Sequence, residues 1–230
     1  QQRKVGIVCQ KYALFPNMNV SKNISYGLEI NKVSKEDINK KVTDVDFATS
    51  ATPIEVMKLL EANQIPYSDE HKNFGVIVAR GSGKNSKQRI EITTFRKENY
   101  SKNRFPKVRF VKSPKIDSQR RDFTVNALYL KPNTKEVLDF HNGLEHIKSG
   151  KLVFIGDAKK RLKEDPLRII RAYRFQMEYN LTIDKKTLRS MNENIFLLKN
   201  ISQSRIKREI EHATTSKIKK QLQKVIHNLY

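Results

Sequence analysis

The stretch Glu164–Phe175 reads EDPLRIIRAYRF and sets charged residues beside an apolar stripe. Its acid, Asp165, is followed at three-residue steps by three arginines, Arg168, Arg171 and Arg174. Its apolar positions are Leu167, Ile170 and Phe175. Steps of three and four residues keep side chains on one side of a helix, so the stretch predicts a helix with one buried face. A solvated surface helix has the same pattern. The stretch alone therefore does not distinguish a surface helix from a helix that contributes to a functional site.

The chain is strongly basic. It has 46 Lys and Arg against 24 Asp and Glu, which gives a net charge of +22 over 230 residues. A charge of this size favours a polyanionic partner, and the phosphate backbone of a nucleic acid is the commonest one. A solvated, lysine-rich surface accounts for part of the excess.

The cysteine count and the apolar runs bear on the compartment. A single cysteine, Cys9, excludes an intramolecular disulfide framework and suits a reducing compartment, so we expect a cytoplasmic protein. The sequence contains no apolar run of about 18 residues, the length that a membrane-spanning helix needs. We therefore expect no membrane partner.

Three regions differ in character, with boundaries near 43 and 150. Residues 44–150 alternate strand-like runs with turns, namely VDFAT, FGVIVAR, QRIEITTF, FTVNALYL and VLDF. The turn-rich GSGKNSK between two of these runs predicts a hairpin, and TPIEVMKLLEANQ predicts a helix capped by Thr52 or Ser50 with Val56, Leu59 and Leu60 on one face. Residues 151–230 carry helical periodicity in DAKKRLKED, PLRIIRAYRFQMEY, KKTLRSMNENIFLL and SQSRIKREIEHA. The fold class predicted is α+β, a mixed sheet with helices followed by an all-helical region.

Acidic residues on two predicted strands form a candidate metal site. Asp44 and Asp46 are two residues apart in TDVDFATSATP, and a strand turns such residues to one face. Two close carboxylates repel unless a cation lies between them, and their hard oxygens favour Mg²⁺. Glu91, in RIEITTFR, is placed to add a third acid from a neighbouring strand. Such a set would suit two-metal phosphoryl chemistry.

Four segments in order resemble the bacterial class II tRNA nucleotidyltransferase and poly(A) polymerase family. They are TDVDFATSATP, IEITTFR, RRDFTVNALYL (120–130) and EDPLRIIRAYRF, and the similarity runs from about Asp44 to about His212. The resemblance implies a nucleotidyltransferase head at 44–150 and a helical, RNA-binding neck at 151–230. It also implies template-independent transfer of CMP or AMP from CTP or ATP to an RNA 3′ end, with tRNA as the expected partner.

The resemblance assigns roles by position. Asp44 and Asp46 would bind Mg²⁺ with Glu91 as third acid and candidate base. Arg121 and Asp122, with Asn126, would hold the ribose and phosphates of the incoming nucleotide. The remaining four residues fall on the motif that reads base and phosphate: Asp165, Arg168, Arg171 and Arg174.

A carboxylate beside a guanidinium can select bases without a template. Cytosine and adenine present an amino donor next to a ring-nitrogen acceptor, whereas uracil and guanine present a carbonyl next to an N–H. We expect Asp165 to accept from the amino group and Arg168 to donate to the ring nitrogen. A wrong base would leave both charges unpaired, which corresponds to discrimination of roughly 10³ or more.

The segment before Asp44 departs from the family pattern. The Gly-Gly-x-Val-Arg-Asp segment that opens the family's head is absent, and residues 4–41 resemble instead the Q-loop region of ABC transporter ATPases, with Gln10 at the loop glutamine. No Walker A motif accompanies it, so ATP hydrolysis by this segment is not expected. We expect residues 1–43 to be an incomplete, fused ABC ATPase-like segment, and the enzyme's body and tail to be missing. The alternative function is a catalytically impaired product that only binds RNA.

Overall fold

The computed structural model describes residues 5–8, 45–80, 89–100, 106–131, 134 and 136–229, with the backbone alone for 5–8, 45 and 46. The chain divides into two compact units. The first comprises Gln1–Asn99, Lys107–Arg120 and Asn126–Phe140, and the second Tyr100–Pro106, Arg121–Val125 and His141–Tyr230.

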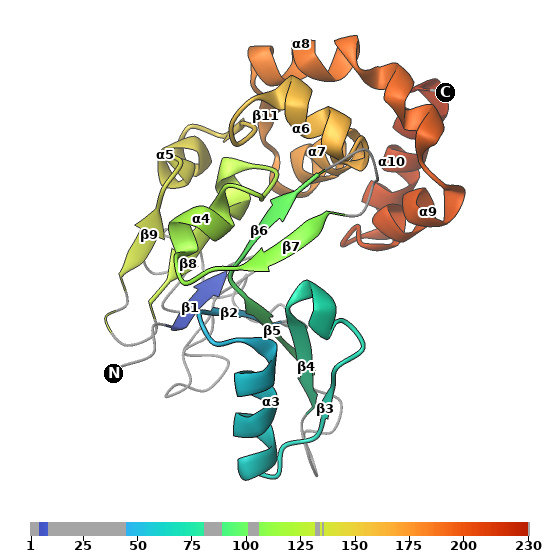
Figure 1. The fold of residues 1–230 in the computed structure, drawn as a ribbon. Coiled ribbons are helices and arrows are strands. Elements are labelled where there is room, and N and C mark those ends of the chain that lie inside the picture. Colours follow the sequence, from blue (N-terminus) through green and yellow to red (C-terminus); the bar gives the residue numbers. More distant parts are fainter. Residues whose placement is uncertain are drawn as a thin grey trace. The chain divides into compact units, whose positions relative to one another are not determined.

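The first unit is built on a sheet whose described part has seven strands in the order β3-β4-β5-β2-β1-β8-β9 (Figure 1). The strands are β1 (Val5–Val8), β2 (Val45–Thr49), β3 (Tyr67–Ser68), β4 (Val76–Arg80), β5 (Arg89–Thr94), β8 (Leu128–Leu130) and β9 (Val137–Asp139). Within the described sheet, β2 and β5 are parallel and the other neighbours are antiparallel. The antiparallel pairing of β4 with β5 confirms the predicted hairpin, whose loop at 81–88 lies outside the described residues.

Helix α3 (Pro53–Ala62) packs against β4 and β5. Thr52 caps it, because the Thr52 hydroxyl accepts from the Glu55 N–H while the Glu55 carboxylate accepts from the Thr52 N–H, and Pro53 sits in the first turn where its missing N–H costs nothing. Val56 and Leu60 are buried against Ile77 and Ala79, as predicted. The prediction was wrong for Leu59, which is 59% exposed, because the face centred on the i, i+4 pair Val56 and Leu60 turns Leu59 toward solvent.

A second hairpin joins the first unit without having been predicted. Strands β6 (Arg96–Asn99) and β7 (Lys107–Phe110) pair antiparallel, and the short helix α4 (Pro114–Ser118) contacts β6. The fully buried carboxylate of Asp117 joins these elements. It accepts from the Arg96 N–H at 2.8 Å and from the Tyr129 hydroxyl at 2.7 Å. The strand RKEN has no apolar alternation, so tertiary contacts and not local pattern hold it in place.

The second unit is largely helical. Its helices are α5 (Gly143–Lys148), α6 (Ala158–Glu164), α7 (Leu167–Tyr179), α8 (Lys185–Glu193), α9 (Gln203–Glu211) and α10 (Ser216–Leu229). A short parallel pair, β10 (Lys151–Leu152) and β11 (Thr182–Ile183), accompanies them. The core contains Phe123, Leu152, Leu162, Ile169, Ile170, Phe175, Met191, Leu198 and Leu222. Within the described residues, no helix has both the length and the apolarity needed to cross a membrane.

The predicted α+β class is confirmed, with a mixed sheet in one unit and helices in the other. Two predicted elements differ in extent. In FTVNALYL, only Leu128–Leu130 is a strand, and Thr124–Asn126 forms the 3₁₀ helix η3. In KKTLRSMNENIFLL, α8 ends at Glu193, since the Asn194 side chain donates to the Ser190 carbonyl at 2.8 Å and a 3₁₀ helix, η4 (Ile195–Asn200), follows.

Candidate functional site

The predicted acids lie on the two parallel strands of the first unit. In the register of β2 and β5, Asp46 is directly paired with Glu91. Glu91 is exposed, and among the described residues it has no ion-pair or hydrogen-bond partner. Its neighbours Ile90 and Ile92 pack against the apolar cluster of Val56, Leu60, Ile77 and Ala79. Nothing in the described part of the chain therefore prevents the Glu91 carboxylate from taking a ligand.

The other two acids of this group are Asp44 and Asp46. Asp44 lies outside the described residues, and for Asp46 only the backbone position is described. No set of three acidic, histidine or cysteine side chains within the described part of the chain is close enough to hold a metal ion. The donor chemistry nevertheless fits Mg²⁺, because β2 carries an acid at the position paired with Glu91 and carboxylate oxygens are the ligands that Mg²⁺ takes from proteins.

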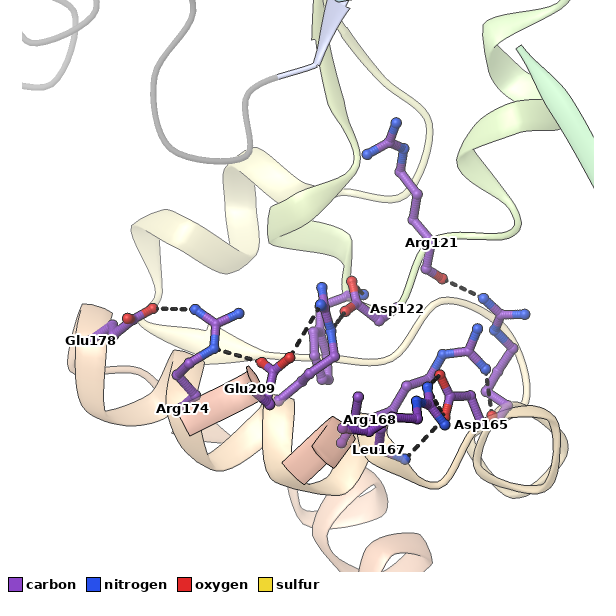
Figure 2. A network of polar contacts seen from close by, with 12 residues as sticks. Arg121, Asp122, Asp165, Leu167, Arg168, Arg174, Glu178 and Glu209 are labelled. Carbon is purple, nitrogen blue, oxygen red and sulfur yellow. Dashed lines mark hydrogen bonds and ion pairs between the residues drawn. The ribbon is translucent and has the colours of Figure 1, made fainter. Parts of the chain in front are cut away.

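The segment Arg121–Asp122 enters the second unit beside α7. Both residues are buried. Asp122 Oδ1 accepts from the Phe123 N–H at 2.9 Å, and Asp122 Oδ2 accepts from Arg171 Nε at 2.6 Å. The Arg121 carbonyl accepts from Arg161 Nη2 at 2.8 Å, as Figure 2 shows. Asn126, the third predicted nucleotide ligand of this motif, is buried in η3 and belongs to the first unit.

Asp165 lies in the turn between α6 and α7, where its carboxylate has two partners (Figure 2). Oδ1 accepts from the Leu167 N–H at 3.2 Å, which satisfies one of the unpaired donors at the start of α7. Arg205, from α9, places Nη2 3.1 Å from Oδ1 and 2.9 Å from Oδ2. The Asp165 side chain remains about a quarter exposed, at 25%. A ligand can therefore still reach the carboxylate.

Arg168 is the second residue of α7, and its side chain contacts α6. Its Nη1 donates to the Arg161 carbonyl and lies 3.3 Å from Glu164 Oε2. Glu164 also pairs with Arg161. Burial lowers the pKa of Arg161, and the neighbouring positive charge of Arg168 lowers it further, while Glu164 opposes both effects. Two guanidiniums thus share one carboxylate, which leaves net positive charge at this end of α7.

Arg171 and Arg174, one and two turns further along α7, are paired with carboxylates inside the second unit. Arg174 Nε donates to Glu209 Oε1 at 2.6 Å, and Arg174 Nη1 donates to Glu178 Oε2 at 2.6 Å. Arg171 Nη1 lies 3.8 Å from Glu209 Oε2. Burial alone would lower the pKa of Arg171, but the carboxylates of Asp122 and Glu209 outweigh it and raise the pKa. The middle of α7 is therefore a neutralised network.

Sequence reasoning missed the partners of these arginines. Glu209 is the main one: it is 4% exposed and joins α9 to α7. A signal for it was present, because Ile206, Glu209 and Ala213 recur at helical spacing and a charged residue on an apolar stripe implies a buried counter-ion. Arg205 carried no such signal, since its partner Asp165 is 40 residues away along the chain.

Three comparisons identify related proteins. The model of the Poly A polymerase head domain matches residues 35–153. The CCA-adding enzyme of Staphylococcus haemolyticus is 38% identical over 176 residues, which is 76% of this chain and 42% of that protein. The CCA-adding enzyme of Limosilactobacillus reuteri is 39% identical over 176 residues, 76% of this chain and 41% of that protein.

Among solved structures, the crystal structure of the Bacillus stearothermophilus CCA-adding enzyme in complex with CTP superposes with a TM-score of 0.63 at 34% identity. The match covers 74% of this chain and 39% of that one. The chain spans less than half the length of these relatives. The resemblance of residues 4–41 to an ABC ATPase segment lies almost wholly outside the described residues and stays a prediction.

Proposed function

Because this chain belongs to the family of the Poly A polymerase head domain, we propose that it carries the nucleotide-transfer centre of an enzyme that adds CMP and AMP to the 3′ end of tRNA. The relatives are CCA-adding enzymes, and one of them is solved with CTP. The net charge of +22 suits an RNA substrate, since Lys and Arg side chains neutralise backbone phosphates. Addition of C, of A or of both uses the same predicted motifs.

The observation that carries the proposal is the register of β2 and β5. It pairs Asp46 with Glu91, and both residues lie inside the family match. Paired positions of neighbouring strands share one face of a sheet. Asp44, two residues before Asp46 on the same stretch, would share that face if the strand conformation extends to it. We propose these three acids as the carboxylate set of the transfer site.

Asp44 and Asp46 would hold magnesium, with Glu91 beside them. Bound there, magnesium supplies charge neutralisation on the triphosphate and favours deprotonation of the attacking 3′ hydroxyl. The exposed Glu91 carboxylate can take that proton, because within the described structure nothing else engages it. The chain's own contribution is to fix the acids on neighbouring strands, so that little reorganisation is needed during transfer.

Base selection would fall to the turn between α6 and α7. Asp165 keeps a partly exposed carboxylate for the amino group of C or A. Arg168 lies one helical turn away and makes its described contacts through Nη1. Asp122 and Arg171, held together at 2.6 Å, would contact the ribose and phosphates with Arg121. Asn126, in the first unit, stays a predicted nucleotide ligand. Arg174 is predicted to belong to this set as well. Its two short contacts to Glu209 and Glu178 give it a competing role as a cross-link between helices.

The direct test is incorporation of labelled CTP and ATP into a tRNA that lacks its terminal CCA, with magnesium present. We expect incorporation of C and A, and little of U or G. Loss of incorporation after chelation of the metal would agree with the carboxylate set. A chain that binds the tRNA but incorporates none of the four nucleotides would contradict the proposal and favour an RNA-binding product.

A further inference from the structure

We infer that Arg80 and Arg89, on strands β4 and β5, form a binding site for the backbone phosphates next to the 3′ end of the RNA substrate. The inference rests on the proposed function, because it takes Glu91 as the place where the 3′ hydroxyl of the RNA reacts. It adds a contact for the RNA itself to that function. The sequence motifs assign neither arginine a role.

The two arginines are neighbours across the pairing of β4 with β5 (Figure 1). In the antiparallel register of these strands, Arg80 is directly opposite Arg89. The backbone of Arg80 is held in place on its other side as well, because its N–H donates to the Pro66 carbonyl at 2.8 Å. Side chains that are directly opposite in a sheet are close together, so the register sets two guanidinium groups beside each other.

The arginines lie on the face of the sheet that carries Glu91. The other face packs on α3 through four apolar residues of β4 and β5, which are Ile77, Ala79, Ile90 and Ile92. Successive side chains of a strand alternate between faces, so Arg80, Arg89 and Glu91 share the face away from α3. Arg89 precedes Glu91 by two residues, a separation of roughly 6.6 Å along the strand. A phosphate bound by the arginines would therefore be close to the carboxylate proposed to take the proton of the 3′ hydroxyl.

The charges of this pair are unfavourable in the absence of an anion. Like charges directly opposite each other destabilise a pair of strands. Both arginines are exposed, and among the described residues neither side chain has an ion-pair or hydrogen-bond partner. Arg96, on strand β6 of the same unit, is by contrast paired with Glu98 at 2.8 Å. Two adjacent guanidiniums suit a phosphate group, because their N–H groups match its oxygens in a bidentate geometry.

The RNA backbone fits this pair better than the triphosphate of the incoming nucleotide does. The proposed function already gives the triphosphate its own arginines, Arg121 and Arg171, in the second unit. The RNA strand brings a row of phosphates, and its 3′ end has to reach Glu91 for the hydroxyl to lose its proton there. Cations two residues from that carboxylate, on the same face, are placed for the phosphates that precede the reacting hydroxyl.

The test is equilibrium binding of a tRNA that lacks its terminal CCA, with magnesium and at several salt concentrations, to the 230-residue chain and its variants. We expect Arg80→Ala and Arg89→Ala each to weaken binding by about fivefold and to reduce the slope of log K against log salt by about one, because one phosphate contact is lost. Arg89→Lys should keep the slope but only part of the affinity, since lysine has the charge without the fork of the guanidinium. Lys58→Ala, which removes the same charge from an exposed position of α3, should change neither quantity.

A neutral linkage in the RNA locates the contact. Replacing the phosphodiester nearest the 3′ end by a methylphosphonate removes one negative charge. This RNA should bind the wild-type chain several-fold more weakly than the unmodified RNA. It should bind a variant with both Arg80→Ala and Arg89→Ala almost as well as the unmodified RNA does, because the groups that contact that charge are gone. The same replacement far from the 3′ end should affect both chains equally, and circular dichroism checks that each variant is folded.

Three results would overturn the inference. The first is a wild-type affinity and salt slope in both single variants. The second is weaker binding of CTP with unchanged binding of RNA, which would assign the arginines to the triphosphate. The third is a shift in the half-saturating magnesium concentration with unchanged binding of RNA, which would make the arginines counter-ions of the acids on β2. The proposed function has a separate readout: a chain that binds RNA through these arginines but incorporates no nucleotide would contradict the proposed function and leave the phosphate site standing.

Discussion

Glu91 on strand β5 and the arginines of helix α7 are all charged residues of the predicted site, but they differ in burial and in ion pairing. Glu91 is exposed and has no partner among the described residues, whereas Arg174 and Glu209 are 5% and 4% exposed and lie 2.6 Å apart. A charge in water costs the fold little when it has no partner, but a buried charge is tolerated only when it is paired. Among the described residues, Glu91 is therefore available to a ligand, whereas Arg174 is committed to ion pairs inside the second unit.

The same contrast recurs along α7 itself. At its beginning, Asp165 is a quarter exposed, and the contacts of Arg168 with the described residues are made through Nη1. Two turns later, Arg174 is enclosed by two carboxylates. Substitutions on the two sides of this contrast should therefore separate activity from stability.

The largest effect is expected at the strand acids. Asp44→Ala and Asp46→Ala should each lower nucleotide incorporation by about 10³-fold or more, because the metal-dependent charge stabilisation is lost. The thermal midpoint should stay near that of the wild type, since removing one of several close like charges relieves repulsion. Asp69→Ala, which removes an exposed acid of the same unit, serves as the control. A double variant as active as the wild type would refute the metal-binding role.

The next effect is one of stability. Glu209→Ala should lower the free energy of unfolding by about 3 kcal/mol, because it removes one of the two carboxylates that pair with the buried Arg174 guanidinium. Glu211→Ala, which removes an exposed acid of the same helix, should change it by less than about 0.5 kcal/mol. Urea unfolding followed by circular dichroism measures both. Equal effects of the two substitutions would show that the network adds nothing to stability.

Asp165→Ala should act on selection more than on stability. We expect kcat/KM for CTP and ATP to fall by the equivalent of about 2 to 4 kcal/mol while relative use of UTP rises, because the acceptor for the amino group is removed. Asp165→Asn retains an oxygen that can accept from the Leu167 N–H and so separates capping from charge. If Asp165→Ala slowed all four nucleotides equally, Asp165 would be a helix cap and no base reader.

The smallest effect is expected for an exposed ion pair. Arg189 and Glu193 of α8 lie 2.9 Å apart, with side chains 83% and 50% exposed. Arg189→Ala should cost no more than about 0.5 kcal/mol of stability, because water screens the pair. Arg174→Ala, compared in the same urea experiment, should cost several times as much. Similar values would remove the distinction between paired and solvated charge on which the comparison rests.

Local pattern predicted the elements whose own residues specify them. The strand β2 and the helices α3 and α7 follow from apolar period and capping residues, and Thr52 with Glu55 fixes the start of α3. The hairpin of β6 and β7 did not follow, because RKEN carries no alternation and is anchored by Asp117, 21 residues from Arg96. The family, too, was predicted from short motifs and is confirmed by the match over residues 35–153.

The sequence alone determined the class of fold, the family and the set of charged residues, because periodicity and short motifs are local properties that survive without a partner. Only the tertiary structure decided which of those charges face a counter-ion. Asp46 stands opposite Glu91 because two parallel strands share a register, Arg174 meets Glu209 because α9 packs on α7, and Asp165 is held by Arg205 from the same helix. The energy of a charge depends on its burial and its nearest opposite charge, and both are set by residues distant along the chain.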